Sequence, residues 1–124
     1  MIIIAQEPQD FSVTLDQFRD ASAAWGPHAS LMGGASDDDP VDANIQVNRP
    51  GEPFFQIFHF KTNAMLSTDG TEEQAAEVAA WAVNTLPKSG PSELWMTDQG
   101  YSGHTVLTPG TGAADVWKGW QEHN

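Results

Sequence analysis

Residues 54–87 read FFQIFHFKTNAMLSTDGTEEQAAEVAAWAVNTLP, and they place two predicted strands directly before the clearest helix of the chain. FFQIFHF, residues 54–60, is apolar on both faces, which is typical of a central strand covered on two sides. We expect residues 63–70 to form its partner strand. Thr71 and Gln74 then have the spacing of a capping box. The apolar positions that follow recur at helical spacing and predict a buried stripe: Ala75, Val78, Ala79, Ala82 and Leu86.

The rest of the chain alternates in the same way between strand and helix patterns. A second capping box, Thr14 with Gln17, opens a predicted helix that ends before Gly26. Further strands are predicted at MIIIA (1–5), NIQVN (44–48), SELWMTD (92–98) and HTVLT (104–108), and a short terminal helix at 111–124. Strands that come in neighbouring pairs with short connections favour an α+β fold. We therefore expect one domain, residues 1–124, with an antiparallel or mixed sheet of five to six strands and two to three helices packed on it.

Residues 26–44, GPHASLMGGASDDDPVDAN, have little periodicity and predict a long acidic loop. Long loops in small domains are usually functional or disordered. Four aspartates lie in it: Asp37, Asp38, Asp39 and Asp42. They lack the spacing of a calcium loop. Three readings stay open: a solvated loop, a docking element for a basic partner, and a weak divalent-cation site.

Charge is the strongest compositional signal. Seventeen acidic residues and five basic ones give a formal net charge of −12. Such a field repels nucleic acid and anionic membranes and attracts basic proteins. The chain has no cysteine, no recognisable signal peptide and no apolar run near the roughly 20 residues that span a bilayer. We expect a cytoplasmic protein whose partner is basic, with neither nucleic acid nor membrane as a partner.

The segment ELWMTDQGYSGHTVLTPG, residues 93–110, places Asp98, Ser102 and His104 close together. The nucleophile pattern G-x-S-x-G lacks its final glycine, and a strand rather than a helix follows it. We interpret the segment as a hairpin loop in which Gly100 and Gly103 supply positive φ angles. The alternative is a small enzyme or small-ligand binder that uses residues 98–104. No metal site or cofactor is predicted, and the one histidine inside a strand pattern, His59, is expected to be a hydrogen-bonded core residue.

The chain resembles small acidic actinobacterial immunity proteins over about residues 55–124. The resemblance rests on FFQIFHF, the capped helix, ELWM, TVLTPG and the tryptophan-bearing DVWKGWQEH. It implies a protein that neutralises a secreted polymorphic toxin by direct binding and has no catalytic residues of its own. The contact residues in such a group vary with the toxin.

Together these observations predict a non-enzymatic immunity protein that inhibits a cognate secreted toxin, of nuclease or NAD-degrading type, through an acidic surface. Such a toxin would carry a basic cleft for its anionic substrate. The candidate steering residues are Asp37, Asp38, Asp39 and Asp42, and the candidate contacts on the hairpin are Tyr101 and His104. The protein itself is expected to be a monomer or a weak dimer.

Overall fold

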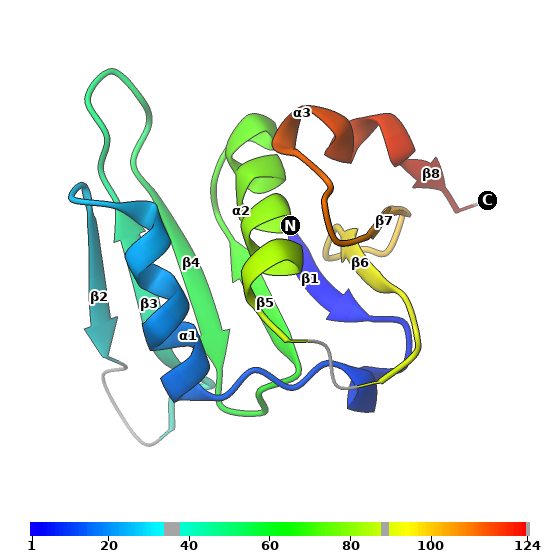
Figure 1. Ribbon diagram of the computed structural model, residues 1–124, viewed down its shortest axis with the longest axis horizontal. Coiled ribbons are helices and arrows are strands. Elements are labelled where there is room, and N and C mark those ends of the chain that lie inside the picture. The colour runs from blue at the N-terminus through cyan, green and yellow to red at the C-terminus, as the bar shows by residue number, and fades with distance from the viewer. Residues whose placement is uncertain (34–37, 88–89, 124) are drawn as a thin grey trace.

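The computed structural model describes residues 1–33, 38–87 and 90–123 of the chain. Within these ranges it shows an α+β fold, in which one eight-stranded antiparallel sheet has three helices packed against it (Figure 1). The helices are α1 (Leu15–Ala21), α2 (Glu72–Thr85) and α3 (Ala113–Val116). The strands are β1 (Ile2–Ala5), β2 (Ala29–Gly33), β3 (Val41–Val47), β4 (Phe55–Phe60), β5 (Met65–Thr68), β6 (Leu94–Thr97), β7 (Gly103–Leu107) and β8 (Gln121–Glu122). The predicted fold class is confirmed.

The strand order across the sheet is β2-β3-β4-β5-β1-β6-β7-β8. The first strand of the chain therefore lies inside the sheet, where Ile3 pairs with Leu66 of β5 on one side and with Met96 of β6 on the other. The prediction of five to six strands is too low, because it misses both edge strands. β2 falls in the segment predicted as a loop, and β8 falls in the segment predicted as the terminal helix.

The hairpin of β2 and β3 corrects the prediction of a loop over residues 26–44. Ala29 pairs with Val47, and Gly33 pairs with Ala43, so both ends of that segment belong to the sheet. The sequence ASLMG of β2 has no β-branched or aromatic residue, and its pairing with β3 supplies what its own propensity lacks. Residues 34–37, and with them the candidate Asp37, lie outside the described part of the chain.

Both predicted capping boxes are present. Thr14 Oγ1 accepts from the Gln17 N–H at 3.1 Å, and Thr71 Oγ1 accepts from the Gln74 N–H at 3.2 Å. The predicted apolar stripe of α2 is buried throughout. α1 is shorter than predicted, because the chain tightens into a 3-10 turn before it reverses at Gly26, whose φ is +79°. No helix of the described ranges has the length and apolar character needed to cross a membrane.

The core lies between the sheet and the helices. Alternate residues of a strand point to opposite faces of a sheet. On the helix-facing side Ile3, Ile45 and Ile57 are buried together with Phe18 of α1 and Val78 of α2. These contacts hold the helical layer on the sheet.

The second face of β4 differs from its prediction. Phe55 and Ile57 are buried in the core, but Phe58 and Phe60 point to the other side of the sheet and are only partly buried. Figure 1 shows α1 and α2 in front of the same face of the sheet. The prediction that residues 54–60 are covered on both sides is therefore wrong, because a two-layer fold covers a central strand on one face only.

Candidate functional site

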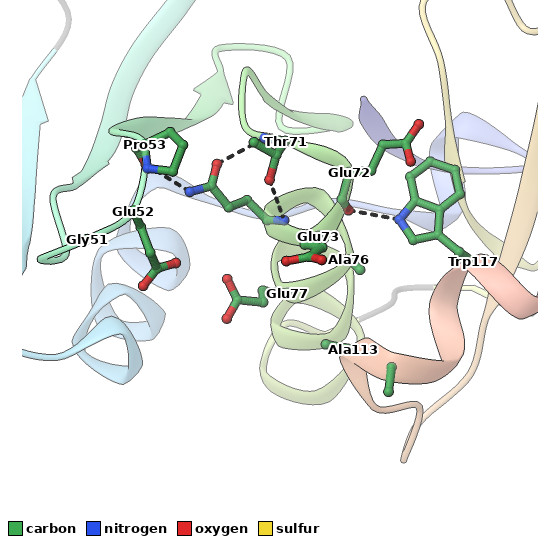
Figure 2. Close-up of a pocket in the computed structure, with 12 residues that line it drawn as sticks. Gly51, Glu52, Pro53, Thr71, Glu72, Glu73, Ala76, Glu77, Ala113 and Trp117 are labelled. Atoms are coloured by element: carbon green, nitrogen blue, oxygen red, sulfur yellow. Dashed lines mark hydrogen bonds between the residues drawn. The ribbon is translucent and has the colours of Figure 1, made fainter.

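A groove of about 910 Å³ lies on the helical side of the molecule, between the turn that precedes β4, the start of α2, and α3 (Figure 2). Four carboxylates line it: Glu52 from the turn, and Glu72, Glu73 and Glu77 from α2. Basic residues contribute nothing to its lining. The groove therefore gathers four negative charges around a hollow that has no basic residue among the described residues of its lining.

Hydrogen bonds between neighbouring segments fix the walls of the groove in place. Gln74 is 3% exposed, and its Nε2 donates to the Pro53 carbonyl at 2.8 Å while its Oε1 accepts from the Thr71 N–H at 2.9 Å. On the other side Trp117 Nε1 donates to the Glu72 carbonyl at 2.8 Å (Figure 2). One glutamine therefore fixes the turn against α2, and one tryptophan fixes the segment after α3 against the same helix.

Glu72 and Glu73 are the two carboxylates of the groove that Arg49 does not contact. They lie in the first turn of α2, where the helix dipole favours negative charge. Their carboxylate oxygens have no hydrogen-bond or ion-pair partner among the described residues. These two groups are therefore available to a cation brought from outside.

Arg49 shows how the other two groove carboxylates bind a guanidinium group. Its Nη2 donates to Glu77 Oε2 at 2.6 Å and to Glu52 Oε1 at 2.8 Å. The hydrogen bond with Glu77 is the main cause that raises the pKa of Arg49 above its ordinary value. The guanidinium carbon also lies 6.0 Å from the Trp25 ring centroid and 5.6 Å from that of Phe55, within the range of cation–π contacts.

A smaller hollow of about 280 Å³ continues from the groove past Glu77 toward Trp25 and Trp81. Trp25 Nε1 and Arg49 Nε are buried there without a hydrogen-bond partner among the described residues. A buried donor without an acceptor costs about 1–3 kcal/mol. Both donors are enclosed by the chain itself, so the folded protein carries this cost internally.

Two other basic side chains are also paired with acids of the same chain. Arg19 lies 3.4 Å from Asp16, and Lys118 lies 3.1 Å from Asp115. These two pairs are exposed and contribute little to stability. Each pair does neutralise one positive charge with an acid of the same chain. The remaining, more numerous acidic residues therefore determine the sign of the surface charge.

The predicted steering aspartates have different environments. Asp38 is exposed, whereas Asp39 Oδ1 accepts from the Val41 N–H at 2.9 Å and so caps the start of β3. Asp42 lies within β3, and its Oδ1 is 2.5 Å from Nδ1 of His59. Steering by Asp38 and Asp39 stays a prediction. Asp42 has an internal partner and is not a free loop residue.

His59 is a buried, hydrogen-bonded core residue, as predicted. Its side chain is fully enclosed, and its Nε2 lies 2.5 Å from the Val13 carbonyl oxygen while Nδ1 faces Asp42. Each ring nitrogen thus has an oxygen partner. The histidine ties β4 to β3 and to the segment that enters α1.

The hairpin between β6 and β7 carries the Asp98, Ser102 and His104 cluster. The Ser102 side chain and its N–H, the latter at 2.8 Å, both donate to the Asp98 carboxylate. The side-chain bond is the first cause that lowers the pKa of Asp98 below its ordinary value. Positive φ occurs at Tyr101, at 53°, and not at Gly100 or Gly103, so the predicted role of the two glycines is wrong.

Gly103 is required for a different reason. A Cβ atom at this position would lie 2.6 Å from the ring of Trp120 and 2.7 Å from the backbone oxygen of Gln121. The C-terminal segment therefore passes directly over β7. Close approach, rather than backbone conformation, excludes a side chain here.

His104 is hydrogen-bonded away from Ser102. Its Nδ1 lies 2.7 Å from Nε2 of His123, whose Nδ1 lies 2.7 Å from the Tyr101 carbonyl, and the His104 ring stacks on Trp95 at 3.9 Å. Among the described residues no hydrogen bond joins Ser102 to His104, which is the contact that would activate a serine nucleophile. The same residues contain no group of three or more His, Cys, Asp or Glu arranged around a metal position.

The five candidate residues that the structure describes do not form one site. Asp38, Asp39 and Asp42 lie at the β2–β3 end of the sheet, and Tyr101 and His104 lie at the β6–β7 end. The groove between them went unrecognised, because its carboxylates come from segments far apart in the chain. The only local signal was TEEQ at residues 71–74, which the sequence explains equally well as a helix start.

Comparison of the chain with protein-family models, curated proteins and solved structures finds no match. Its function is therefore inferred from the geometry and charge of its own residues.

Proposed function

We propose that this protein is a non-enzymatic immunity protein, which binds a basic toxin domain in the cytoplasm and blocks its active site. The observation that carries the proposal is the groove with four carboxylates on the helical side. A toxin that acts on nucleic acid or on NAD needs a basic cleft to hold its anionic substrate. A groove of opposite charge competes for the arginine and lysine residues of that cleft.

The groove offers a cation two kinds of contact. Glu72 and Glu73 supply exposed carboxylates, and Trp117 supplies an aromatic wall beside them. Arginine and lysine bind carboxylates by charge-assisted hydrogen bonds and lie favourably over aromatic rings. The internal complex of Arg49 with Glu52, Glu77 and two aromatic rings shows the same chemistry within the chain.

The charge of the whole molecule supports the same partner class. The net charge of −12 attracts a basic protein at long range and speeds its association. Asp38 and Asp39 remain candidates for this steering, and Tyr101 and His104 remain candidate contacts. The groove adds direct contacts with the partner, which the long-range attraction of the net charge does not provide.

The proposal predicts that a neighbouring gene encodes a secreted protein with a C-terminal toxin domain, and the test is co-expression of this chain with that domain. The proposal predicts that this protein protects the cell from that domain and co-purifies with it. A Glu72→Gln/Glu73→Gln variant should protect less well, whereas Glu7→Gln/Asp20→Asn, with the same change in net charge elsewhere, should protect as the wild type does. Unprotected cells, with no complex between the two purified proteins, would contradict the proposal.

A further inference from the structure

The sheet has a second apolar surface on the side opposite the helices. The strand register places its members on one face, since Ile4 pairs with Met65 and with Trp95, and Trp95 pairs with Val106. Phe58 lies on the same face, because its partner Ser67 also pairs with Ile2 of β1. The outer face, as we call this surface, consists of Ile2, Ile4, Phe58, Phe60, Met65, Trp95 and Val106, with Met32 at its β2 edge.

The outer face is separate from the core. None of its members belongs to the core cluster or packs against it as a partly buried neighbour. Ile2 is buried within the face at 6% exposure, Met32 is 46% exposed, and the other members are intermediate. The described helices pack on the opposite side of the sheet, so they leave this surface uncovered.

The centre of the outer face lacks formal charge. The other strand residues that share the face by register are Ser30, Val41, Asn44, Gln46, Gln56, Ser67, Thr97 and His104. Two carboxylates reach its rim from beside the strand ends, where Glu93 Oε1 accepts from Trp95 Nε1 at 3.2 Å and Asp69 Oδ2 accepts from Gln56 Nε2 at 3.4 Å. The chain has seventeen acidic residues, so their absence from the centre of this face departs strongly from the overall composition. Contiguous apolar surface on a protein commonly marks an interaction site.

We infer that the outer face binds a second copy of this chain, sheet against sheet. Two identical faces can meet through a twofold axis over their uncharged centres, which leaves Glu93 and Asp69 at the rim, and an isologous contact needs only one self-complementary surface. A basic partner would find no carboxylate at the centre of the face to compensate its buried charges. This interface goes beyond the proposed function and does not depend on it, because the acidic groove lies on the helical side.

The size of the face predicts a weak dimer. Strands β1 to β7, about 4.8 Å apart and four to seven residues long at about 3.3 Å per residue, span roughly 550 Å². Specific interfaces bury about 800 Å² per partner, so this one lies near the lower limit. The like charges of two copies also repel, and salt screens that repulsion. The dimer should therefore form more strongly at high salt.

Sedimentation velocity over a roughly hundredfold range of protein concentration, in about 20 mM and about 500 mM NaCl, tests this inference. We expect a monomer–dimer equilibrium that shifts toward the dimer as concentration and salt rise. Phe58→Glu should abolish the dimer. Ala114→Glu, which makes the same change in net charge at an exposed position of α3, should leave it intact.

Circular dichroism establishes that each variant is folded, and Phe58→Gln replaces Phe58→Glu if the charged variant is not. A wild-type protein that stays monomeric throughout would overturn the inference. So would a dimer that Phe58→Glu and Ala114→Glu affect equally, or one that dissociates as salt rises. Loss of toxin-domain binding in Phe58→Glu, without any wild-type dimer, would also overturn it and assign the face to the other protein.

Discussion

The buried polar residues of the described chain each have a specific hydrogen-bond partner: His59, Thr68, Gln74, Thr97 and Thr105. His59 sits in an apolar interior with oxygen atoms at both ring nitrogens, one from Asp42 and one from the Val13 carbonyl. Its place in the core was predictable from the strand pattern around it. Its partners were not, because Asp42 was assigned to a loop and Val13 lies 46 residues away in the chain.

Replacement of Asp42 by alanine should destabilise the protein by about 1–3 kcal/mol, since it leaves a fully buried ring nitrogen without its partner. Urea unfolding followed by tryptophan fluorescence measures the effect. Asp38→Ala removes a neighbouring carboxylate that is exposed, and it should change the unfolding free energy by less than about 0.5 kcal/mol. Equal effects of the two substitutions would contradict the role given to Asp42.

The pKa of Asp98 is lowered first by its side-chain hydrogen bond with Ser102. A carboxyl with a folded-state pKa below its unfolded value stabilises the fold above that unfolded value, about 3.9, and the contribution is lost as the pH falls through the folded-state pKa. In Ser102→Ala the pKa of Asp98 should rise toward its ordinary value, because only the backbone donors remain. Carboxyl NMR titration measures it, and an unchanged pKa would refute the assignment.

At the scale of elements, α2 organises the acidic groove. Its first turn carries Glu72 and Glu73, and Gln74 fixes the turn at Pro53 while it completes the capping box. The capping box itself was readable from the threonine and glutamine three residues apart. The contact with Pro53 was not, because the two residues are 21 positions apart.

Gln74→Glu tests this second role against a matched control. Glutamate can still accept from the Thr71 N–H, but it cannot donate to the Pro53 carbonyl and it places a charge in a buried position. We expect a loss of about 1–3 kcal/mol in unfolding free energy. Gln17→Glu makes the same change in the exposed capping box of α1 and should stay within about 0.5 kcal/mol of wild type. A loss of similar size in both variants would show that capping alone explains the effect.

At the scale of the whole molecule, local patterns predicted the fold class and distant contacts decided the rest. Capping boxes and strand alternation act over a few residues, so the helices and inner strands were predictable. The edge strands β2 and β8 carry little strand propensity and depend on a neighbour for pairing. The groove likewise needs residues 51–53, 71–77 and 113–117 to meet, which no local pattern encodes.

The two opposite surfaces of the molecule give its interactions opposite salt dependences. Binding of a basic partner by the acidic groove should weaken as salt screens attraction, whereas pairing of two outer faces should strengthen as salt screens the repulsion between two acidic copies. The two kinds of complex can therefore be told apart in one protein preparation.

On the proposed function, the groove itself, and not the net charge alone, captures a basic toxin domain. Stopped-flow association of the purified protein with the toxin domain that co-purifies with it, measured at low and high salt, separates these two contributions. Glu72→Gln/Glu73→Gln should slow association at low salt by about threefold or more, and the difference should shrink at high salt. Glu7→Gln/Asp20→Asn should associate at close to the wild-type rate. Equal slowing in both double variants, or no slowing in either, would contradict the claim.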